Sequence, residues 1–371
     1  MEPFLTATLT NDTPVFLGGY DTQYVRDGIS EGLRVQSLKG LLRYWMRAYL
    51  AGAGYRLEQI NEEVNRICGG KTREEMHSSK IQIKYKINYD EPASSALKDV
   101  PRIKLLELGK NRISLTFANK LSASISLYAV NNINDDDKKL VIGSLLTGLL
   151  LSGIGKMSRR GFGCFNIKIE NDTTRLFRSN IDSLFSTTTI DKRIECIRNI
   201  ISLTRNSIKG YNINKLPEIH AMHPNYYKIF YLPLTNKSPL TAVKELQGFT
   251  VRSLRGRNDN ITRERGRNDN ITRERLAWFL GLPRSQRGTG YFAKDKGEDV
   301  ERRASPLFIA VHKDFALVSI FKSSDWPSTI EWRGGYRKSF RLDIDIDKAF
   351  NIITESFISY ATNKGYKVIG V

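Results

Sequence analysis

The chain has 371 residues, of which 40% are apolar and 26% are charged, the composition of a folded protein with room for two cores. Its 58 lysines and arginines outnumber 39 acidic residues, and the excess of +19 indicates a large anionic partner, either nucleic acid or an acidic membrane surface. No secretory leader is visible, and the longest apolar stretch, around 145–154, is too short to cross a bilayer. Three widely separated cysteines lack metal or redox spacing. We therefore expect a cytoplasmic protein with no membrane partner.

The first half of the sequence shows six elements in the order β-α-β-β-α-β. Alternating residues over 4–9 predict a strand, and apolar residues three and four apart predict a helix over 37–50 with Ser37 as its N-cap. A helical insertion over 57–67 follows. The remaining elements are strands at 81–87 and around 125–127, a helix at 138–152 and a strand at 164–169. This order is typical of the ferredoxin-like fold.

The second half repeats this order after a helical connector at about 190–204. Its elements are a strand at 227–232, a basic segment with a helix at 276–280, strands at 306–312 and 316–321, a helix at 347–362 and a strand near 366–371. We predict an α+β protein with two tandem ferredoxin-like, or RRM-like, domains over 1–172 and 227–371, joined by a connector over 173–226. The polar, arginine-rich decapeptide 256–265 recurs unchanged as 266–275, a unit too short for a solenoid repeat.

A glycine-rich loop is the most specific local signal. Gly153, Gly155, Gly161 and Gly163 alternate with basic and hydroxyl residues between a predicted helix and a predicted strand. Glycine lets a backbone approach a ligand closely, and free amides and arginine forks can bind phosphate oxygens. The loop lacks the strand-first order of a dinucleotide site and the Gly-Lys-Ser/Thr ending of a Walker loop. It therefore predicts contact with an RNA backbone, whereas the alternative is a tight turn with solvated arginines.

Two other basic segments are candidates for the same role. Lys39, Arg43 and Arg47 are spaced four apart on the predicted helix, so they form a stripe that can follow phosphates, although such a stripe can also be an ordinary solvated face. The neighbouring Tyr44 and Trp45 are more typical of a core than of a base-stacking surface. Further basic residues accompany Gly281-Leu-Pro-Arg284 and precede the strand at 306–312.

The blocks EGLR…SLKGLLRYWMR, GIGKMSRRGFGCF and GLPR…RRASPLFI together resemble the RAMP superfamily, and within it the first subunits of Cmr-type (type III-B) CRISPR effector complexes. The resemblance reaches both halves. It implies two RAMP domains in a ribonucleoprotein of antiviral defence, with other RAMP subunits as neighbours. It also implies that the chain holds target RNA, the 3′ region of CRISPR RNA, or both, while another subunit cleaves the target. The second half has no glycine-rich loop before its last strand, so arginines are expected to bind RNA there.

The complete set of residues expected to bind RNA is Arg34, Lys39, Arg43, Arg47, Gly153, Gly155, Lys156, Ser158, Arg159, Arg160, Gly161, Phe162, Gly163, Arg252, Arg255, Arg284, Arg287, Arg302 and Arg303. Base pairing with the guide would supply sequence specificity. No catalytic residue, metal or cofactor is expected.

Catalysis is the weaker interpretation. Relatives that process CRISPR RNA often use a histidine in the first loop or helix, but residues 10–50 contain none. His220 and His223 lack a nearby cysteine or carboxylate at metal-ligand spacing, while His77 and His312 suit surface and strand positions. Asp21 and Asp27 lie where RAMP slicing subunits carry an aspartate, although loop aspartates are commonly turn formers. A RAMP-type endoribonuclease and an assembly protein with little RNA contact therefore remain alternatives.

Overall fold

The computed structural model of the chain describes residues 2–17, 33–72, 75–93, 97, 99–103, 117–211, 213, 215–250, 276–282, 284–286, 289–295, 298–299, 303–333, 339–342 and 344–371. Several residues of interest in the sequence lie outside these ranges, namely Asp21, Asp27, Arg252, Arg255, Arg287, Arg302 and the duplicated decapeptides, as does the side chain of Arg284.

The first half forms an antiparallel sheet with the strand order β4-β5-β1-β6. Its strands are β1 (Pro3–Asn11), β4 (Ile81–Ala93), β5 (Phe117–Ala129) and β6 (Phe165–Asp172). The helices that connect them are α1 (Val35–Gly52) and α4 (Asp135–Leu151), and α1 is followed by α2 (Leu57–Cys68) and the small hairpin of β2 (Gly70–Lys71) and β3 (Met76–His77). Counted along the chain, the four sheet strands lie in the order 2-3-1-4, which is the ferredoxin-like arrangement.

The second half builds a sheet of the same topology, β11-β12-β7-β15, again antiparallel. Its elements are β7 (Tyr227–Pro233), α7 (Pro239–Thr250), β11 (Leu307–Val311), β12 (Phe315–Phe321), α9 (Ile346–Asn363) and β15 (Ile369–Gly370). The connector between the halves contains α5 (Arg178–Ser186) and α6 (Ile190–Arg205). The predicted pair of ferredoxin-like domains is therefore confirmed, and the exact domain boundaries remain a prediction.

Two parts of the second half differ from the expectation. The segment at 276–280 is only a 3-10 turn, η3 (Ala277–Leu280), and the crossover helix is α7, where the Ser238 hydroxyl accepts a hydrogen bond from the Thr241 amide at 3.2 Å. Serine immediately before proline is a helix-start signal, and Ser238 and Pro239 provide it. The helix was nevertheless predicted farther along the chain, at 276–280 in the basic segment. A third, unexpected sheet has the order β10-β9-β13-β14 with β8 paired to β9. Its strands are β8 (Arg284–Gln286), β9 (Thr289–Asp295), β10 (Glu298–Asp299), β13 (Thr329–Arg333) and β14 (Ser339–Leu342).

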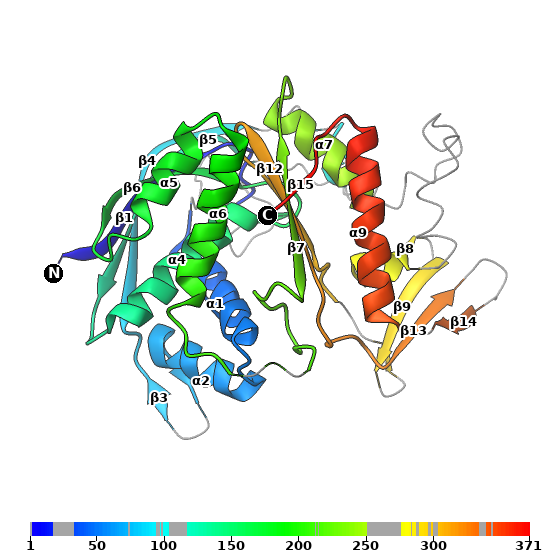
Figure 1. Ribbon diagram of the computed structural model, residues 1–371, viewed down its shortest axis with the longest axis horizontal. Helices are drawn as coiled ribbons and strands as arrows, with labels where there is room; N and C mark the ends of the chain where they lie inside the picture. The colour runs from blue at the N-terminus through cyan, green and yellow to red at the C-terminus, as the bar shows by residue number, and fades with distance from the viewer. Residues whose placement is uncertain are drawn as a thin grey trace.

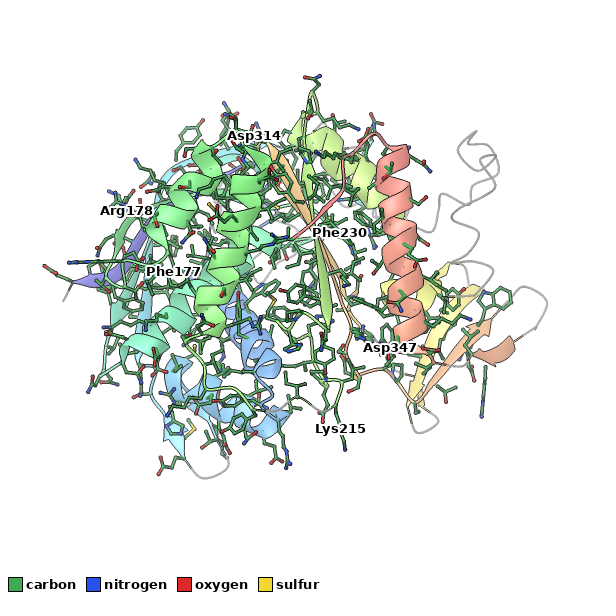
Figure 2. All side chains as sticks on the ribbon, in the orientation of Figure 1. Phe177, Arg178, Lys215, Phe230, Asp314 and Asp347 are labelled. Carbon is green, nitrogen blue, oxygen red and sulfur yellow. The ribbon has the colours of Figure 1, made fainter. Side chains whose placement is uncertain are left out.

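The elements stack in layers, and the second sheet is buried on both faces. Figure 1 shows the first sheet, the helices α1, α4 and α6, the second sheet, and then α7 and α9 in succession across the view. Along β11, Phe308 and Ala310 belong to the core shared with the first half, whereas Leu307 and Ile309 pack in the core beneath α7 and α9. Burial on both faces explains why β11 and β12 appear as uninterrupted apolar runs in the sequence. In Figure 2, Phe230 lies within these layers, while Arg178 lies at the start of α5 and Asp347 at the lower end of α9, and both are exposed.

Helix α4 runs between the two sheets and is buried on every side from Leu140 to Leu151. Two glycines allow its close packing: a Cβ atom at Gly143 would lie 1.9 Å from the Thr204 hydroxyl of α6, and one at Gly148 would lie 2.6 Å from the Trp45 ring of α1. The apolar character of α4 therefore results from its central position. Among the described residues, no helix is both long and apolar enough to cross a membrane.

Candidate nucleic-acid interface

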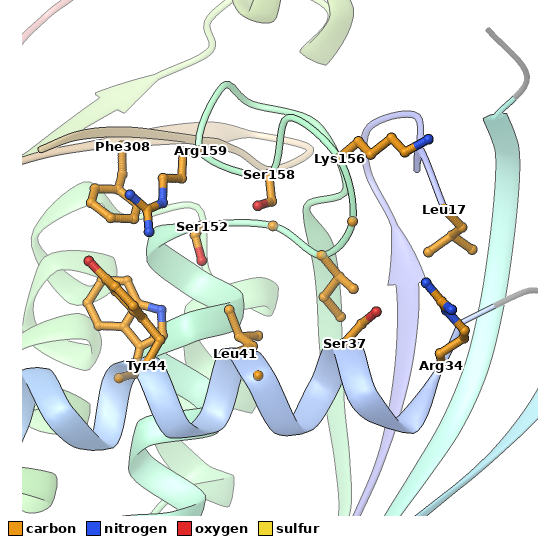
Figure 3. Close-up of a pocket in the computed structure, with 15 residues that line it drawn as sticks. Leu17, Arg34, Ser37, Leu41, Tyr44, Ser152, Lys156, Ser158, Arg159 and Phe308 are labelled. Carbon is orange, nitrogen blue, oxygen red and sulfur yellow. The ribbon is translucent and has the colours of Figure 1, made fainter. Parts of the chain in front are cut away.

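A cavity of about 440 Å³ lies where α1, the glycine-rich loop and β11 meet. Figure 3 shows Arg34 and Tyr44 approaching it from α1 and its N-terminal end, Lys156 and Arg159 from the loop, and Phe308 from the second half. Among the described residues that line it, three side chains are cationic and none carries a carboxylate. Both ferredoxin-like halves therefore contribute to one positively charged, partly aromatic cavity.

Backbone hydrogen bonds hold the glycine-rich loop in place. The amide of Gly153 donates to the Ser158 carbonyl at 2.9 Å, that of Gly161 to Ile309 at 2.8 Å, and that of Gly163 to Pro14 at 2.9 Å. The sequence suggested that the amides of this loop bind phosphate. For the amides of Gly153, Gly161 and Gly163 that expectation is corrected, because they already donate hydrogen bonds within the protein. Their glycines serve conformation instead: Gly161 and Gly163 have φ values of 82° and 65°, which side-chain-bearing residues rarely adopt.

Two further loop residues, Arg160 and Phe162, contact the second half of the chain and do not line the cavity. Phe162 is fully buried, packs edge-on against Phe16 with ring centroids 4.9 Å apart, and belongs to the core beneath α7 and α9 in the second half. The Arg160 guanidinium donates from Nη1 to the Leu307 carbonyl at 3.0 Å. The backbone carbonyl of Arg160 accepts from the Gln247 side chain at 2.7 Å. Phe162 is therefore a core residue, and Arg160 connects the loop to β11 and α7.

Arg159 is the loop residue best placed to meet a ligand. Its guanidinium lies over the rings of Tyr44 and Phe308, at 5.0 and 4.7 Å from their centroids. Arginine over aromatic faces is held in position without losing its outward N–H donors. Since no ion pair joins Arg159 to a described carboxylate, its positive charge is directed at the cavity. Lys156 and Ser158 line the same wall, and Gly155 is exposed beside them.

A neutral hydrogen-bonded pair supports Arg159 from below. The Tyr44 hydroxyl and His220 Nδ1 lie 2.5 Å apart, and the His220 ring stacks on Phe321. Burial, together with the nearby charge of Arg303, lowers the pKa of His220 to about 3, and burial raises the pKa of Tyr44 to about 12. Both groups are therefore uncharged at neutral pH. The described residues include no group of three or more potential metal ligands, and His223 Nδ1 instead accepts from the Asn225 amide.

The basic stripe of α1 faces away from the cavity. Arg43 donates from Nη1 to the Gly69 carbonyl at 3.0 Å and from Nη2 to the side chain of Asn65, at the end of α2. The charges of Arg43, Lys39 and Arg47 all lower the pKa of the buried Cys68 thiol, although the larger effect of burial raises it to about 11. The stripe therefore lies over the end of α2, and the α1 face that meets the cavity carries Ser37, Leu41 and Tyr44 instead.

The side chain of Arg303 is also held inside the protein by its own contacts. Its side chain is 7% exposed, donates to Asp325 Oδ1 at 2.8 Å and to the Ser323 hydroxyl at 3.1 Å, and lies 3.5 Å from the centroid of the Trp326 ring. The expectation that Arg303 binds RNA is therefore corrected. Of the expected basic residues, Arg34, Lys156 and Arg159 meet at the cavity. Phe308 was missed because only the packing of the halves brings it there.

His312, which the sequence placed at the end of a strand, lies directly after β11. It is fully buried, with Nδ1 3.1 Å from the Phe165 carbonyl and Nε2 3.0 Å from the Leu150 carbonyl. These contacts join the β11–β12 turn to the first half. His312 is therefore part of the structural junction between the halves.

Comparisons with known proteins agree with this architecture. The RAMP superfamily model matches residues 8–166, which include β4, β5, parts of β1 and β6, and the glycine-rich loop. The apo crystal structure of Cmr1 from Pyrococcus furiosus is similar over 99% of this chain and 98% of its own, with a TM-score of 0.57 and 18% identity.

Two further similar structures are chains of type III-B Cmr-beta complexes. One complex is bound to cognate target RNA and AMPPNP in the presence of single-stranded DNA, and its chain has a TM-score of 0.57 and 14% identity over 97% of this chain and 99% of that chain. The other is bound to cognate target RNA, and its chain has a TM-score of 0.53 and 14% identity over 96% of this chain and 100% of that chain. No curated protein matches the sequence. Residues 8–166 thus match the RAMP superfamily model, and the chain has the fold of Cmr1 along nearly its whole length.

Proposed function

We propose that the chain is a non-catalytic RNA-binding subunit of a type III-B CRISPR ribonucleoprotein, which holds target RNA, the 3′ region of CRISPR RNA, or both, in the cytoplasm. The observation that carries this proposal is the cavity itself. Arg34, Lys156 and Arg159 line it together with the Tyr44 and Phe308 rings, and none of the described lining residues is acidic. Cations suit phosphates, and aromatic surfaces suit bases of a single strand.

The comparisons give this RNA-binding cavity a biological setting. Chains of the same fold belong to type III-B complexes bound to cognate target RNA, and Cmr1 shares the fold from end to end. The net charge of +19 suits the same kind of partner. We therefore infer that neighbouring RAMP subunits and the guide RNA supply the sequence specificity, while this chain binds the backbone.

The test is binding of the purified full chain to end-labelled single-stranded RNA across a salt series. The double substitution Lys156→Ala/Arg159→Ala should weaken binding about a hundredfold or more, because each charge-assisted contact contributes roughly 1.5–3 kcal/mol. The slope of log K against log salt should fall by about 1.4, since each contact with a single strand contributes about 0.7. The loss should be equal for unrelated RNA sequences.

A matched control is Lys313→Ala/Arg341→Ala, which removes two exposed cations that do not line the cavity. This variant should bind like the wild-type chain. The same samples run on a denaturing gel should contain intact RNA. A base-specific loss in the cavity variant, or RNA cut at one fixed position by the wild-type chain, would contradict the proposal.

A further inference from the structure

A second cationic cavity, of about 430 Å³, lies between α6, β7 and β15. Its charged lining residues are Arg198 and Arg205 of α6 and Lys228 of β7, and no acidic side chain lines it in the described part of the chain. It shares no lining residue with the cavity at the glycine-rich loop. Since β11 and β15 are the two outer strands of the second sheet, the two cavities lie at opposite edges of that sheet.

The helix supplies its two arginines from one face. Arg198 and Arg205 are seven residues apart, or about two helical turns, so both side chains project from the same side of α6 with Ile201 and Ser202 between them. Arg198 Nη2 donates to the Gly370 carbonyl at 3.3 Å, which fixes its side chain at the rim beside β15. Ile201 and Ile229 are buried, so the floor of the cavity is apolar.

The positive charge of this cavity is not neutralised within the described residues. No ion pair joins Arg198, Arg205 or Lys228 to any described carboxylate, and Arg198 and Lys228 are exposed. Arg205 and Arg198 also act on Tyr227: burial raises the pKa of its hydroxyl, and the two guanidinium charges oppose this rise. Both charges therefore reach the tyrosine that lines the same cavity.

We propose that this second cavity binds the phosphodiester backbone of RNA, as a contact separate from the glycine-loop cavity. The inference rests on the proposed RNA-binding function and extends it to a second part of the strand. Two guanidinium groups and one ammonium group around an apolar floor with a tyrosine match a nucleotide, whose phosphate needs cations and whose base needs an apolar or aromatic surface. An acidic peptide would use the cations and leave the apolar floor without a partner.

The first test compares the full-length chain with its Arg198→Ala/Arg205→Ala/Lys228→Ala variant in RNA binding across a salt series. The slope of log K against log salt should fall by about 2, because three contacts with a single strand contribute about 0.7 each. The control Arg178→Ala/Lys313→Ala/Arg341→Ala, whose residues line neither cavity, should keep the wild-type slope. An unchanged slope in the first variant would overturn the proposal.

A second measurement uses the wild-type chain and so does not depend on how the variant folds. RNA that contains 4-thiouridine, crosslinked by light, should label peptides that include residues 198–205 or 224–230. Labelling confined to other peptides would overturn the second site. A wild-type chain that binds no RNA would instead refute the proposed function itself. Binding of polyglutamate that is lost in the triple variant, with RNA binding unchanged, would assign the cavity to acidic peptides and also overturn the proposal.

Discussion

At the scale of single residues, two arginines show why the sequence alone does not identify a binding site. Arg159 and Arg303 both lie over aromatic rings, but Arg303 is paired with Asp325 and buried, whereas Arg159 borders the cavity. Both arginines lie in basic segments that contain glycine or serine, so the local composition of the sequence does not distinguish them. Asp325 is 22 positions from Arg303, and only the fold brings it there. The structure brings Arg34, Lys156 and Arg159 together at the cavity, and their binding of RNA stays a prediction.

The pair of His220 and Tyr44 below Arg159 predicts a pH dependence of stability. The pKa of His220 falls from 6.5 in the unfolded chain to about 3 in the folded chain. Between these values the unfolded state binds a proton that the folded state does not, so stability is complete above pH 6.5 and falls as the pH decreases. Replacing His220 by Gln, which keeps an acceptor for the Tyr44 hydroxyl, should remove this contribution.

Urea unfolding at pH 7.5 and pH 5.0 measures the effect. The loss of unfolding free energy on acidification should be smaller in His220→Gln than in the wild-type chain by about 2 kcal/mol, at 1.36 kcal/mol for each pH unit below 6.5. His77→Gln changes a histidine outside this pair and should lose as much stability as the wild-type chain. An equal loss in all three proteins would show that His220 titrates normally in the folded state.

At the scale of elements, periodicity predicted most of the two principal sheets because their strands and helices each bury a regular face. The stripe of Lys39, Arg43 and Arg47 was recognised on α1, but which face of a helix meets a ligand depends on its neighbours. Here the stripe lies over the end of α2, where Arg43 is hydrogen-bonded. The helix α7 was missed beside a long basic segment. The strands β8, β10 and β14 have only two to four residues, which are too few for alternation to be recognised. The strands β9 and β13 were also missed, although they are as long as the predicted strands β7 and β11.

The close contact of α4 with α6 gives a prediction for helical glycines. Replacing Gly143 by Ala should destabilise the protein by about 1–3 kcal/mol, because the added Cβ would lie 1.9 Å from the Thr204 hydroxyl and overpacking outweighs the gain in helix propensity. The matched control is Gly40→Ala in α1, where nothing lies within 4 Å, so that variant should be stabilised by up to about 1 kcal/mol. Denaturant unfolding without RNA compares them, and equal gains would contradict the tight packing of α4.

At the scale of the whole molecule, the order of elements predicted two copies of one fold, but not the way in which they pack. Each copy has its own local periodicities, so its topology can be recognised separately. Their packing depends on residues that alternate between two cores: Phe308 and Ala310 join the core of the first half, while Leu307 and Ile309 pack under α7 and α9. The binding cavity arises from this packing, because β11 provides one wall of it.

This shared core predicts that the two halves unfold together. His312, Cys164 and the β11–β12 turn are bonded across the junction, so opening one half would expose the apolar inner face of the second sheet. Ile125→Ala in the first sheet and Phe357→Ala in α9 remove buried side chains from opposite outer layers. Each should lower stability by about 2–5 kcal/mol, and both should shift one common calorimetric transition. If the halves were independent, two transitions would separate and each substitution would move only one. In that case the cavity would also lose the fixed wall that Phe308 supplies, and RNA affinity would depend on the docking of two separately folded domains.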